Sequence, residues 1–315
     1  MKLSVSGFAV AAVFGLVASS LGATAAYAEG SEDPDPATVI SQIVPDALAS
    51  AAPLTATTDG LTAHARDSEV TISDREDALI QLATGRADIT VEIDSAMLGG
   101  SLTEESGVAT FAHADGDASV VNLNDDGSLR ITSVLQSDNS QGSFAYTYTG
   151  VELVLFDDGG VVGYDDTGAV QLVIDLPWAY DSSGAPVPTW YELDGNVLTQ
   201  VVDHSSGSFQ YPIVADPTNY GGNTMYKKIS AATDPEGGDK VSVTVGTYNF
   251  SRTSDSAIWA SYKSLVPAKY ESETMRKQLL CHARNIGALK NPWNLETRRP
   301  NVSYAEFVLK LCNPN

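Results

Sequence analysis

The fold of this chain is decided by a stretch in which two strand-like runs follow each other closely. The first run is Phe144-Ala145-Tyr146-Thr147-Tyr148, and the second is Val151-Glu152-Leu153-Val154-Leu155-Phe156. Aromatic and β-branched residues dominate both runs, and these residue types are enriched in β-strands. Asp157-Asp158-Gly159 comes next, and an Asp-Gly pair between apolar runs signals a hairpin turn. The stretch therefore predicts two strands followed by a hairpin.

The same alternation of strand and turn signals extends in both directions from this stretch. Asp125-Asp126-Gly127 precedes it, and Asp194-Gly195-Asn196 follows it. Val170–Leu176 is another apolar run of strand length. Short strands at regular spacing are typical of meanders, sandwiches and barrels. We therefore expect a β-rich domain over residues 66–218.

The charge of the chain is divided unequally between two segments. The 315 residues carry a net charge of −22, and 43% of them are hydrophobic, which is enough to build a core. Residues 29–220 hold four basic and 32 acidic residues, whereas residues 221–315 hold 13 basic and eight acidic ones. The net charges are therefore −28 and +5, and this asymmetry indicates two domains with different partners. Nucleic acid is excluded as a partner of the acidic segment only.

Residues 1–28 have the pattern of a Sec-type signal peptide. Lys2 precedes the apolar run Phe8–Val17, and Ala26-Tyr27-Ala28 forms a cleavage site, so we expect cleavage after Ala28. The apolar run is too short for a membrane span, and the sequence ends without an apolar tail. We therefore expect a secreted, extracellular protein without a membrane anchor in its mature form.

The remaining segments are predicted from local signals. Residues 29–65 read as an acidic, flexible lead with a short helix over residues 37–52 that Pro45 interrupts. Residues 219–240 are polar and Gly-rich, which predicts a linker. Residues 241–315 then form the basic domain. The expected fold class is α+β in two parts, namely a β-rich acidic region and a small α-rich domain.

Three helix starts are expected in the basic domain. Asp255 is a candidate N-cap for a first helix, and Ser272 for a second that Gly287 would end. Ser303 and Glu306 have the spacing of a capping box, which predicts a third helix. The domain is therefore expected to be mainly helical after one strand over residues 241–245.

The two cysteines, Cys281 and Cys312, lie in this basic domain. Two cysteines in a secreted chain most simply form one disulfide bond. A reactive thiol or a metal-binding pair is the alternative, and it fits an oxidising compartment poorly because the chain has no CxxC spacing. The predicted disulfide would close a loop of 32 residues.

Several short motifs of the basic domain resemble one known family. They are Cys281-His282, Lys290-Asn291-Pro292-Trp293-Asn294-Leu295-Glu296, Arg299-Pro300 and Cys312-Asn313-Pro314. In these residues the chain resembles the DUF2599 family, a domain of unknown function in secreted, mostly actinobacterial proteins. The resemblance covers about 75 residues, and it departs from the family at Arg298, where we expect an aromatic residue. It implies no activity.

Candidate functional residues fall within the same motifs. His282, Glu296 and Arg299 could act as acid, base and phosphate clamp in RNA cleavage. Trp293, Arg299 and Lys290 are the candidates for binding. The alternative is structural: Glu296 and Arg299 form an ion pair, Trp293 covers the core beside the disulfide, and His282 lies at the edge of its helix.

No residues point to a metal or a cofactor. Asn122–Gly127 has the first half of an EF-hand spacing, but Ser133 stands where a bidentate Glu is needed. The sequence also lacks the nucleophile elbow, the zinc-binding HExxH pair, the P-loop and the dinucleotide fingerprint. We therefore expect no metal and no cofactor.

Two functions remain open. The favoured hypothesis is a non-enzymatic binding protein whose basic domain takes an anionic cell-wall polymer or a secreted protein as partner. The alternative is a secreted toxin or RNase-like hydrolase, and nucleic acid is a partner only under this alternative.

Overall fold

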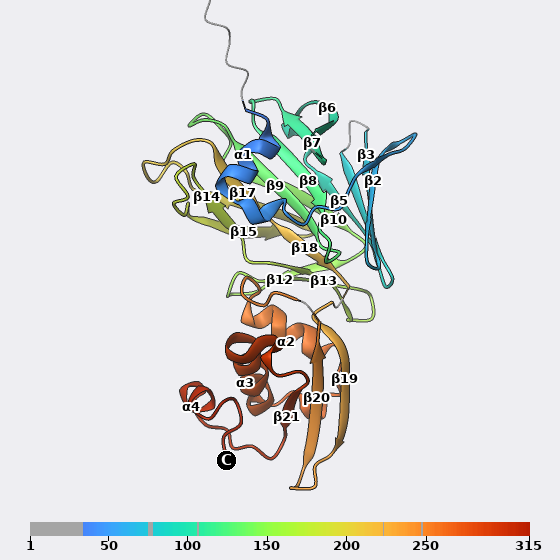
Figure 1. Ribbon diagram of the computed structural model, residues 1–315, viewed down its shortest axis with the longest axis vertical. Coiled ribbons are helices and arrows are strands. Elements are labelled where there is room, and N and C mark those ends of the chain that lie inside the picture. Colours follow the sequence, from blue (N-terminus) through green and yellow to red (C-terminus); the bar gives the residue numbers. More distant parts are fainter. Residues whose placement is uncertain (1–33, 75–77, 106, 223, 247) are drawn as a thin grey trace, which may run out of the picture. The chain divides into compact units, whose positions relative to one another are not determined.

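The computed structural model describes residues 34–74, 78–105, 107–222, 224–246 and 248–315. The predicted signal peptide therefore lies outside the described residues. Within them, two large antiparallel sheets precede a smaller sheet that is accompanied by helices (Figure 1). Residues 34–315 form one compact unit. No described helix is long and apolar enough to cross a membrane.

The first large sheet has eight strands within the described residues. In spatial order they are β1 (Thr55–Ala56), β2 (Gly60–Ala65), β3 (Ser68–Ser73), β4 (Leu79–Thr84), β5 (Asp88–Ile93), β10 (Ser143–Thr149), β16 (Val197–Val202) and β15 (Thr189–Asp194).

The second large sheet has ten strands, again counting described residues only. Its main path is β11 (Glu152–Leu155), β12 (Val161–Tyr164), β13 (Val170–Ile174), β18 (Thr218–Gly221), β9 (Leu129–Leu135), β8 (Ala118–Leu123), β7 (Val108–His113) and β6 (Leu98–Glu105). Beside this path, β17 (Ile213–Asp216) pairs with β9 and β14 (Trp178–Tyr180).

The two runs that decide the fold are both strands, but they belong to different sheets. β10 pairs with β5 and β16, whereas β11 pairs with β12. Gly150 lies between them with φ +92°, and a Cβ there would come within 2.4 Å of the Asp88 carbonyl oxygen. A glycine is therefore needed where the chain leaves the first sheet for the second.

The predicted hairpin turns are confirmed. Asp157-Asp158-Gly159 connects β11 to β12, and the Gly159 N–H donates to the Phe156 carbonyl oxygen at 2.9 Å. Asp194-Gly195-Asn196 connects β15 to β16 in the same way. The expected β-rich fold is therefore present, and its strands begin with β1 and β2, within the segment predicted as a lead.

The main core lies between the two large sheets. Ile72, Leu82 and Tyr146 come from the first sheet and are fully buried or nearly so. They belong to one hydrophobic cluster with Phe111 and Ile131 from the second sheet. Aromatic side chains remove large apolar areas from water, so this cluster makes a major contribution to stability.

The helix near the start of the described chain is packed rather than part of a flexible lead. α1 (Pro36–Ile43) begins after Asp35, whose carboxylate accepts from the Thr38 N–H at 3.0 Å. Pro45 ends it as expected, and a 3₁₀ turn, η1 (Pro45–Ala47), follows. Ile40 is fully buried against the second sheet. The prediction of a flexible lead was wrong here because the apolar face of α1 has a sheet to cover.

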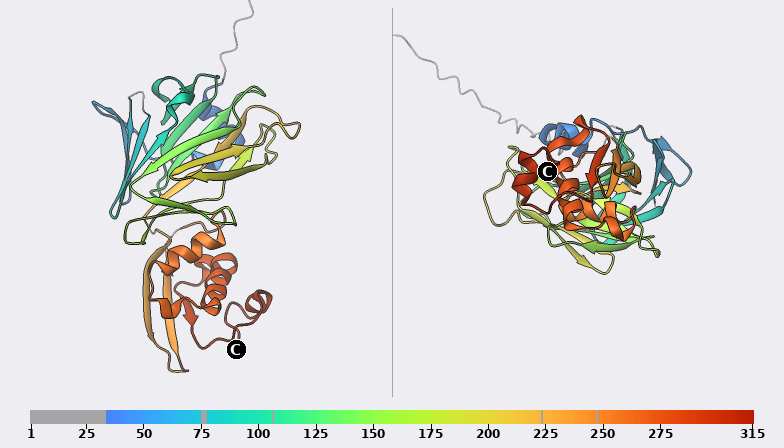
Figure 2. Two further views of the ribbon diagram at one scale, coloured as in Figure 1. Left: turned by 180° about the vertical axis from the view of Figure 1, so that it is seen from behind. Right: turned by 90° about the horizontal axis from the view of Figure 1, so that it is seen from below.

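The C-terminal region contains a sheet as well as helices, so the expectation of an α-rich domain was incomplete. Figure 2 shows the helices on one side of this sheet. The strands are β19 (Tyr226–Thr233), β20 (Asp239–Val245) and β21 (Trp293–Glu296); the helices are α2 (Asp255–Lys263), α3 (Glu273–Cys281) and α4 (Tyr304–Leu309), with the turns η3 (Ala268–Tyr270), η4 (His282–Ile286) and η5 (Gly287–Leu289).

Residues 219–240, predicted as a linker, are mostly strand. They contain the end of β18, all of β19 and the start of β20. Gly237 and Gly238 form the turn between β19 and β20, with φ +108° and +73°. The Gly-rich pattern therefore marked a hairpin turn, because a glycine pair allows the positive φ angles that such turns need.

Two of the three helix caps were predicted correctly. Ser272 and Ser303 accept hydrogen bonds from the N–H groups of Met275 and Glu306. At α2 the cap is Ser254, whose hydroxyl accepts from the Ala257 N–H at 3.0 Å. Asp255 instead pairs with Arg284 at 2.7 Å.

The C-terminal region shares a hydrophobic core with β12 and β13. Val162, Val170 and Val173 belong to the same buried cluster as Ile258 and Trp293. The Asp158 carboxylate accepts from the Ser256 N–H at 2.8 Å.

A buried carboxyl group lies beside this shared core. The Thr253 hydroxyl donates to the Asp175 carboxyl at 2.7 Å, and Asp175 is 4% exposed. Burial and the nearby Asp216 carboxylate together raise the pKa of Asp175 to about 7. The hydrogen bond from Thr253 acts in the opposite direction. The folded protein therefore takes up a proton at Asp175 near neutral pH.

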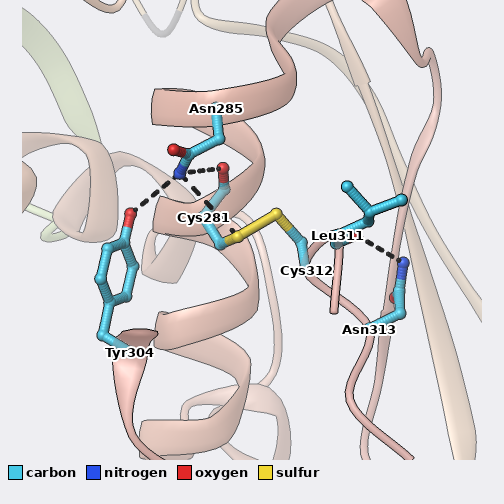
Figure 3. The surroundings of a disulfide bond; sticks show 6 residues. All are labelled: Cys281, Asn285, Tyr304, Leu311, Cys312 and Asn313. Atoms are coloured by element: carbon cyan, nitrogen blue, oxygen red, sulfur yellow. Dashed lines mark hydrogen bonds between the residues drawn. A yellow bond between two sulfur atoms is a disulfide. The ribbon is translucent and has the colours of Figure 1, made fainter. Parts of the chain in front are cut away.

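The predicted disulfide is present between Cys281 and Cys312, with their Cα atoms 5.5 Å apart (Figure 3). Both cysteines are fully buried and pack against Phe307 of α4. The bond therefore connects the end of α3 to the segment that follows α4. The Asn285 side chain donates to the Cys281 carbonyl oxygen at 3.1 Å and to the Tyr304 hydroxyl at 3.3 Å.

Removing the disulfide should destabilise the C-terminal region. We expect the double substitution Cys281→Ser and Cys312→Ser to lower the free energy of unfolding by about 3 to 4 kcal/mol, because the open loop regains conformational entropy when unfolded. Urea unfolding followed by tryptophan fluorescence measures the change. A reductant should destabilise the unchanged protein and leave the double variant unaffected. Equal sensitivity of both proteins to reductant would contradict the prediction.

Candidate functional site

The candidate residues are positioned by α3, its π-helical continuation η4 and the strand β21. Glu296 lies on β21, where the Gln278 side chain of α3 binds its backbone. The Gln278 amide donates to the Glu296 carbonyl oxygen at 3.0 Å and accepts from the Glu296 N–H at 2.9 Å. Gln278 thus satisfies backbone groups of β21 that β20 does not pair with, and it fixes the helix against the strand.

His282 is a core residue, so the interpretation of it as a satisfied edge residue was wrong. It is fully buried, and its ring stacks on Trp293 with the ring centroids 5.8 Å apart and the planes inclined by 10°. Neither ring nitrogen has a hydrogen-bond partner among the described residues. Burial, together with the positive charge of Lys290, lowers the pKa of His282 to about 4. His282 is therefore neutral at pH 7 and closed to solvent.

Trp293 is equally buried. Its indole N–H donates to the Gly287 carbonyl oxygen at 2.9 Å, and its ring packs on Phe250 at 5.4 Å. A tryptophan with no exposed surface and a satisfied N–H offers nothing to a ligand. Trp293 therefore acts in the core. It belongs to the main buried cluster of the C-terminal region, whereas Cys281 and Cys312 pack in a separate cluster with Phe307.

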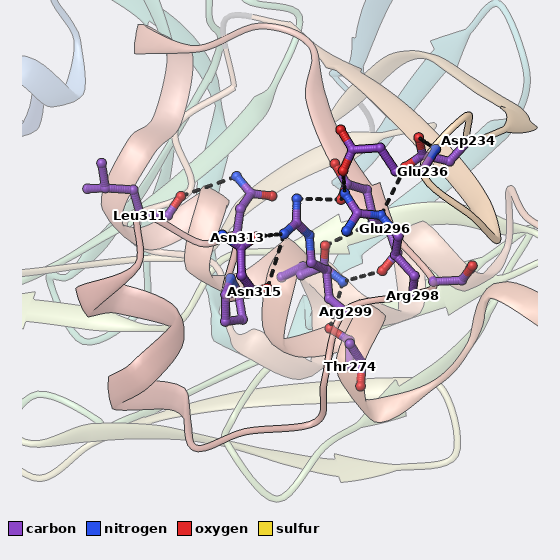
Figure 4. Close-up of polar contacts among 12 residues, drawn as sticks. Asp234, Glu236, Thr274, Glu296, Arg298, Arg299, Leu311, Asn313 and Asn315 are labelled. Carbon is purple, nitrogen blue, oxygen red and sulfur yellow. Dashed lines mark hydrogen bonds and ion pairs between the residues drawn. The ribbon is translucent and has the colours of Figure 1, made fainter.

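Glu296 and Arg299 do meet, as the structural alternative predicted. The Glu296 carboxylate pairs with the Arg299 guanidinium at 2.5 Å and with that of Arg298 at 3.0 Å (Figure 4). Arg299 also donates to the Pro314 carbonyl oxygen at 3.2 Å and to the Asn315 side chain. Both members of the Glu296–Arg299 pair are nearly buried, with exposed side-chain fractions of 13% and 10%.

Arg298 is the residue that sequence reasoning undervalued. It pairs with Glu236, with Asp234 at 3.5 Å and with Glu296 at 3.0 Å. The first two acids lie in the turn between β19 and β20, so Arg298 ties that turn to the segment after β21. The departure from the family pattern replaces an expected aromatic contact with an ion network. Glu236 and Asp234 carried no local signal for this role, because they lie about 60 residues earlier in the sequence.

The structure therefore brings the candidates together as two separate pairs. His282 meets Trp293 in the core, and Glu296 meets Arg299 in the ion network. Neither a hydrogen bond nor an ion pair connects one pair with the other in the part of the chain that the structure describes. Alternation along β21 places Trp293 and Leu295 toward the core, and Glu296 falls in the opposite set of positions.

Residues 233–315 match the model of the family described as "Protein of unknown function (DUF2599)". The match begins at the last residue of β19 and includes β20, β21 and the three α-helices. The chain shows no significant match to curated proteins or to solved structures. The comparison thus supports the presence of this domain and implies no activity.

Of the 13 cations of residues 221–315, six pair with acidic side chains, six are lysines without an ion pair among the described residues, and Arg252 lies over the Trp178 ring at 5.0 Å. Arg276, Arg284, Arg298, Arg299, Lys269 and Lys277 pair with acidic side chains. Six lysines form no ion pair within the described residues, namely Lys227, Lys228, Lys240, Lys263, Lys290 and Lys310. Lys290, a binding candidate, is exposed and follows Leu289, which is 94% exposed. Lys310 lies between the exposed Leu309 and Leu311.

The burial of His282 should make the stability of the protein depend on pH. Its folded pKa of about 4 lies below its usual value of 6.5, so the unfolded chain binds the proton more tightly. Stability from this group is present above pH 6.5 and is lost as the pH falls toward 4. The loss should be roughly 3 kcal/mol.

The measurement compares the unchanged protein with His282→Phe by urea unfolding at several pH values. Asp175 shifts in the opposite direction, so the difference between the two proteins isolates the contribution of His282. That difference should change between pH 7 and pH 4. Parallel profiles for the unchanged protein and His282→Phe would refute the prediction.

Proposed function

We propose that this protein is a secreted, non-enzymatic binding protein that holds an anionic cell-wall polymer through its C-terminal region. The observation that carries the proposal is the set of six lysines without acidic partners. Four of the five arginines of the region pair with specific carboxylates, and the fifth, Arg252, lies over the Trp178 ring at 5.0 Å. The remaining positive field therefore comes mainly from the lysines. Lysine ammonium groups on flexible stems suit a repeating polyanion that needs no fixed geometry.

The site geometry supports binding over catalysis. An RNase-like site needs a proton-transferring group within reach of the substrate. His282 is buried in the aromatic core, and its lowered pKa leaves the ring uncharged at pH 7, so it cannot act as a general acid. Glu296 is held between two guanidinium groups. No described contact favours the hydrolase alternative.

Secretion belongs to the same proposal and rests on the signal-peptide pattern of residues 1–28. The disulfide supports it, since such bonds persist in oxidising compartments. The cell surface would then be the first extensive polyanion that the protein meets after export. The strongly acidic residues 29–220 would be repelled by that polymer and would leave the basic region to make contact.

Co-sedimentation of the whole mature chain with purified cell walls tests the proposal. Binding should fall by about tenfold between about 0.05 M and about 0.5 M salt, because surface charges are screened. The triple variant Lys263→Gln, Lys290→Gln and Lys310→Gln should bind more weakly at low salt. A matched control, Thr58→Glu with Thr103→Glu and Ser182→Glu, changes the net charge equally in the β-rich region before residue 220 and should bind normally.

Two outcomes would overturn this proposal. One is an absence of binding at every salt concentration by a protein shown to be folded. The other is growth arrest on cytoplasmic expression of residues 29–315 that His282→Ala or Glu296→Ala relieves, since this would indicate a catalytic toxin.

A further inference from the structure

The outer edge of β19 is a strand edge that the fold leaves uncovered. Among the described residues, β19 pairs with β20 on one side and with no strand on the other. Lys228 and the four residues from Ser230 to Thr233 are exposed, and Ile229 is half-buried. Figure 1 shows β19 as the outermost strand of its sheet. Such an edge presents unpaired backbone groups to solvent.

The contacts of β20 show which backbone groups of β19 point outward. Asp239 uses its own backbone on the far side, because its N–H donates to the Thr297 hydroxyl at 2.8 Å and its carbonyl oxygen accepts from the Thr297 N–H at 2.9 Å. Thr233, which lies opposite Asp239, therefore directs its N–H and carbonyl away from β20. The alternation of an antiparallel ladder gives Ala231 and Ile229 the same orientation.

The side chains along this edge are small, and the charges at its two ends are opposite. Ser230, Ala231 and Ala232 leave the backbone open to close approach. Lys227 and Lys228 stand at the start of the strand, whereas Asp234 and Glu236 follow its end. Asp234 is buried and, like Glu236, pairs with Arg298, but the Glu236 side chain is 72% exposed. Three carboxylates (Asp234, Glu236 and Glu296) share two guanidinium groups here, so this end keeps a negative charge. An antiparallel copy of the same strand would place each lysine end beside the exposed Glu236 carboxylate. A parallel copy would place like charges together.

We propose that β19 pairs antiparallel with β19 of a second copy of this chain, about a two-fold axis at Ala231. In this register Ala231 faces Ala231 of the second copy, and Ile229 faces Thr233 of the second copy. All three outward-directed residues then exchange backbone hydrogen bonds, and Lys228 lies opposite Asp234 of the second copy. The two sheets become one continuous sheet, and the interface is self-complementary, as two-fold symmetry requires.

The expected dimer is weak. One pair of strands buries less than the roughly 1,000 Å² that a stable interface needs. Self-association should therefore depend on concentration. This interaction surface is separate from Lys263, Lys290 and Lys310, so its presence or absence is independent of wall binding by those residues.

Sedimentation equilibrium over a range of concentrations tests the proposal with a charge-complementation pair. Ala231 is exposed, so Ala231→Glu and Ala231→Lys should both fold, as circular dichroism would verify. Each variant alone should self-associate about fivefold more weakly, because like charges meet at the two-fold axis. An equimolar mixture should recover association as a heterodimer. Lys228→Glu should also weaken the dimer, whereas Lys263→Glu, with the same change in net charge, should not.

Amide hydrogen exchange provides a second readout. The N–H groups of Ile229, Ala231 and Thr233 should gain protection as the concentration rises, and those of Ser230 and Ala232 should be protected at all concentrations. A protein that stays monomeric throughout would overturn the proposal. So would a dimer that forms equally well in both Ala231 variants and in their mixture.

Discussion

The C-terminal region depends on the burial of one strand between two others. Val241, Val243 and Val245 of β20 are all buried, while β19 and β21 pair with its two edges. Asp239 at the start of β20 binds Thr297 through its backbone, and its carboxylate accepts from Lys269 at 3.0 Å and from the Tyr270 hydroxyl at 3.1 Å. The hairpin, the segment after β21 and the turn η3 therefore all meet at this strand.

The same arrangement explains why the candidate catalytic residues do not form an active site. β21 completes the sheet by placing Trp293 in the core, and α3 covers it, so His282 is enclosed with Trp293. Glu296 satisfies the charges of Arg298 and Arg299, which in turn hold the β19–β20 turn and the chain near Pro314. The burial and the charge neutralisation of these residues stabilise the packing of the C-terminal region.

Local patterns predicted the elements whose stability is itself local. The turns at Gly159 and Gly195, the helix break at Pro45 and the caps at Ser272 and Ser303 follow from backbone geometry and from hydrogen bonds within a few residues. The strand β21 escaped prediction because it has only four residues and is stabilised by pairing with β20, about 50 positions earlier. The segment 219–240 was misassigned for a different reason, because its Gly-rich stretch was interpreted as a linker, whereas Gly237 and Gly238 form the hairpin turn between β19 and β20.

The sequence alone determined the β-rich fold, the disulfide between Cys281 and Cys312 and the DUF2599 resemblance, and it offered the ion pair between Glu296 and Arg299 as one of two alternatives. These depend on residue type and short spacing. Only the tertiary structure decided that β10 and β11 belong to different sheets, that His282 and Trp293 are buried together, and that Arg298 joins acids from a distant turn. Burial and long-range ion pairing depend on which surfaces pack together, and this information is not contained in any short segment of the chain.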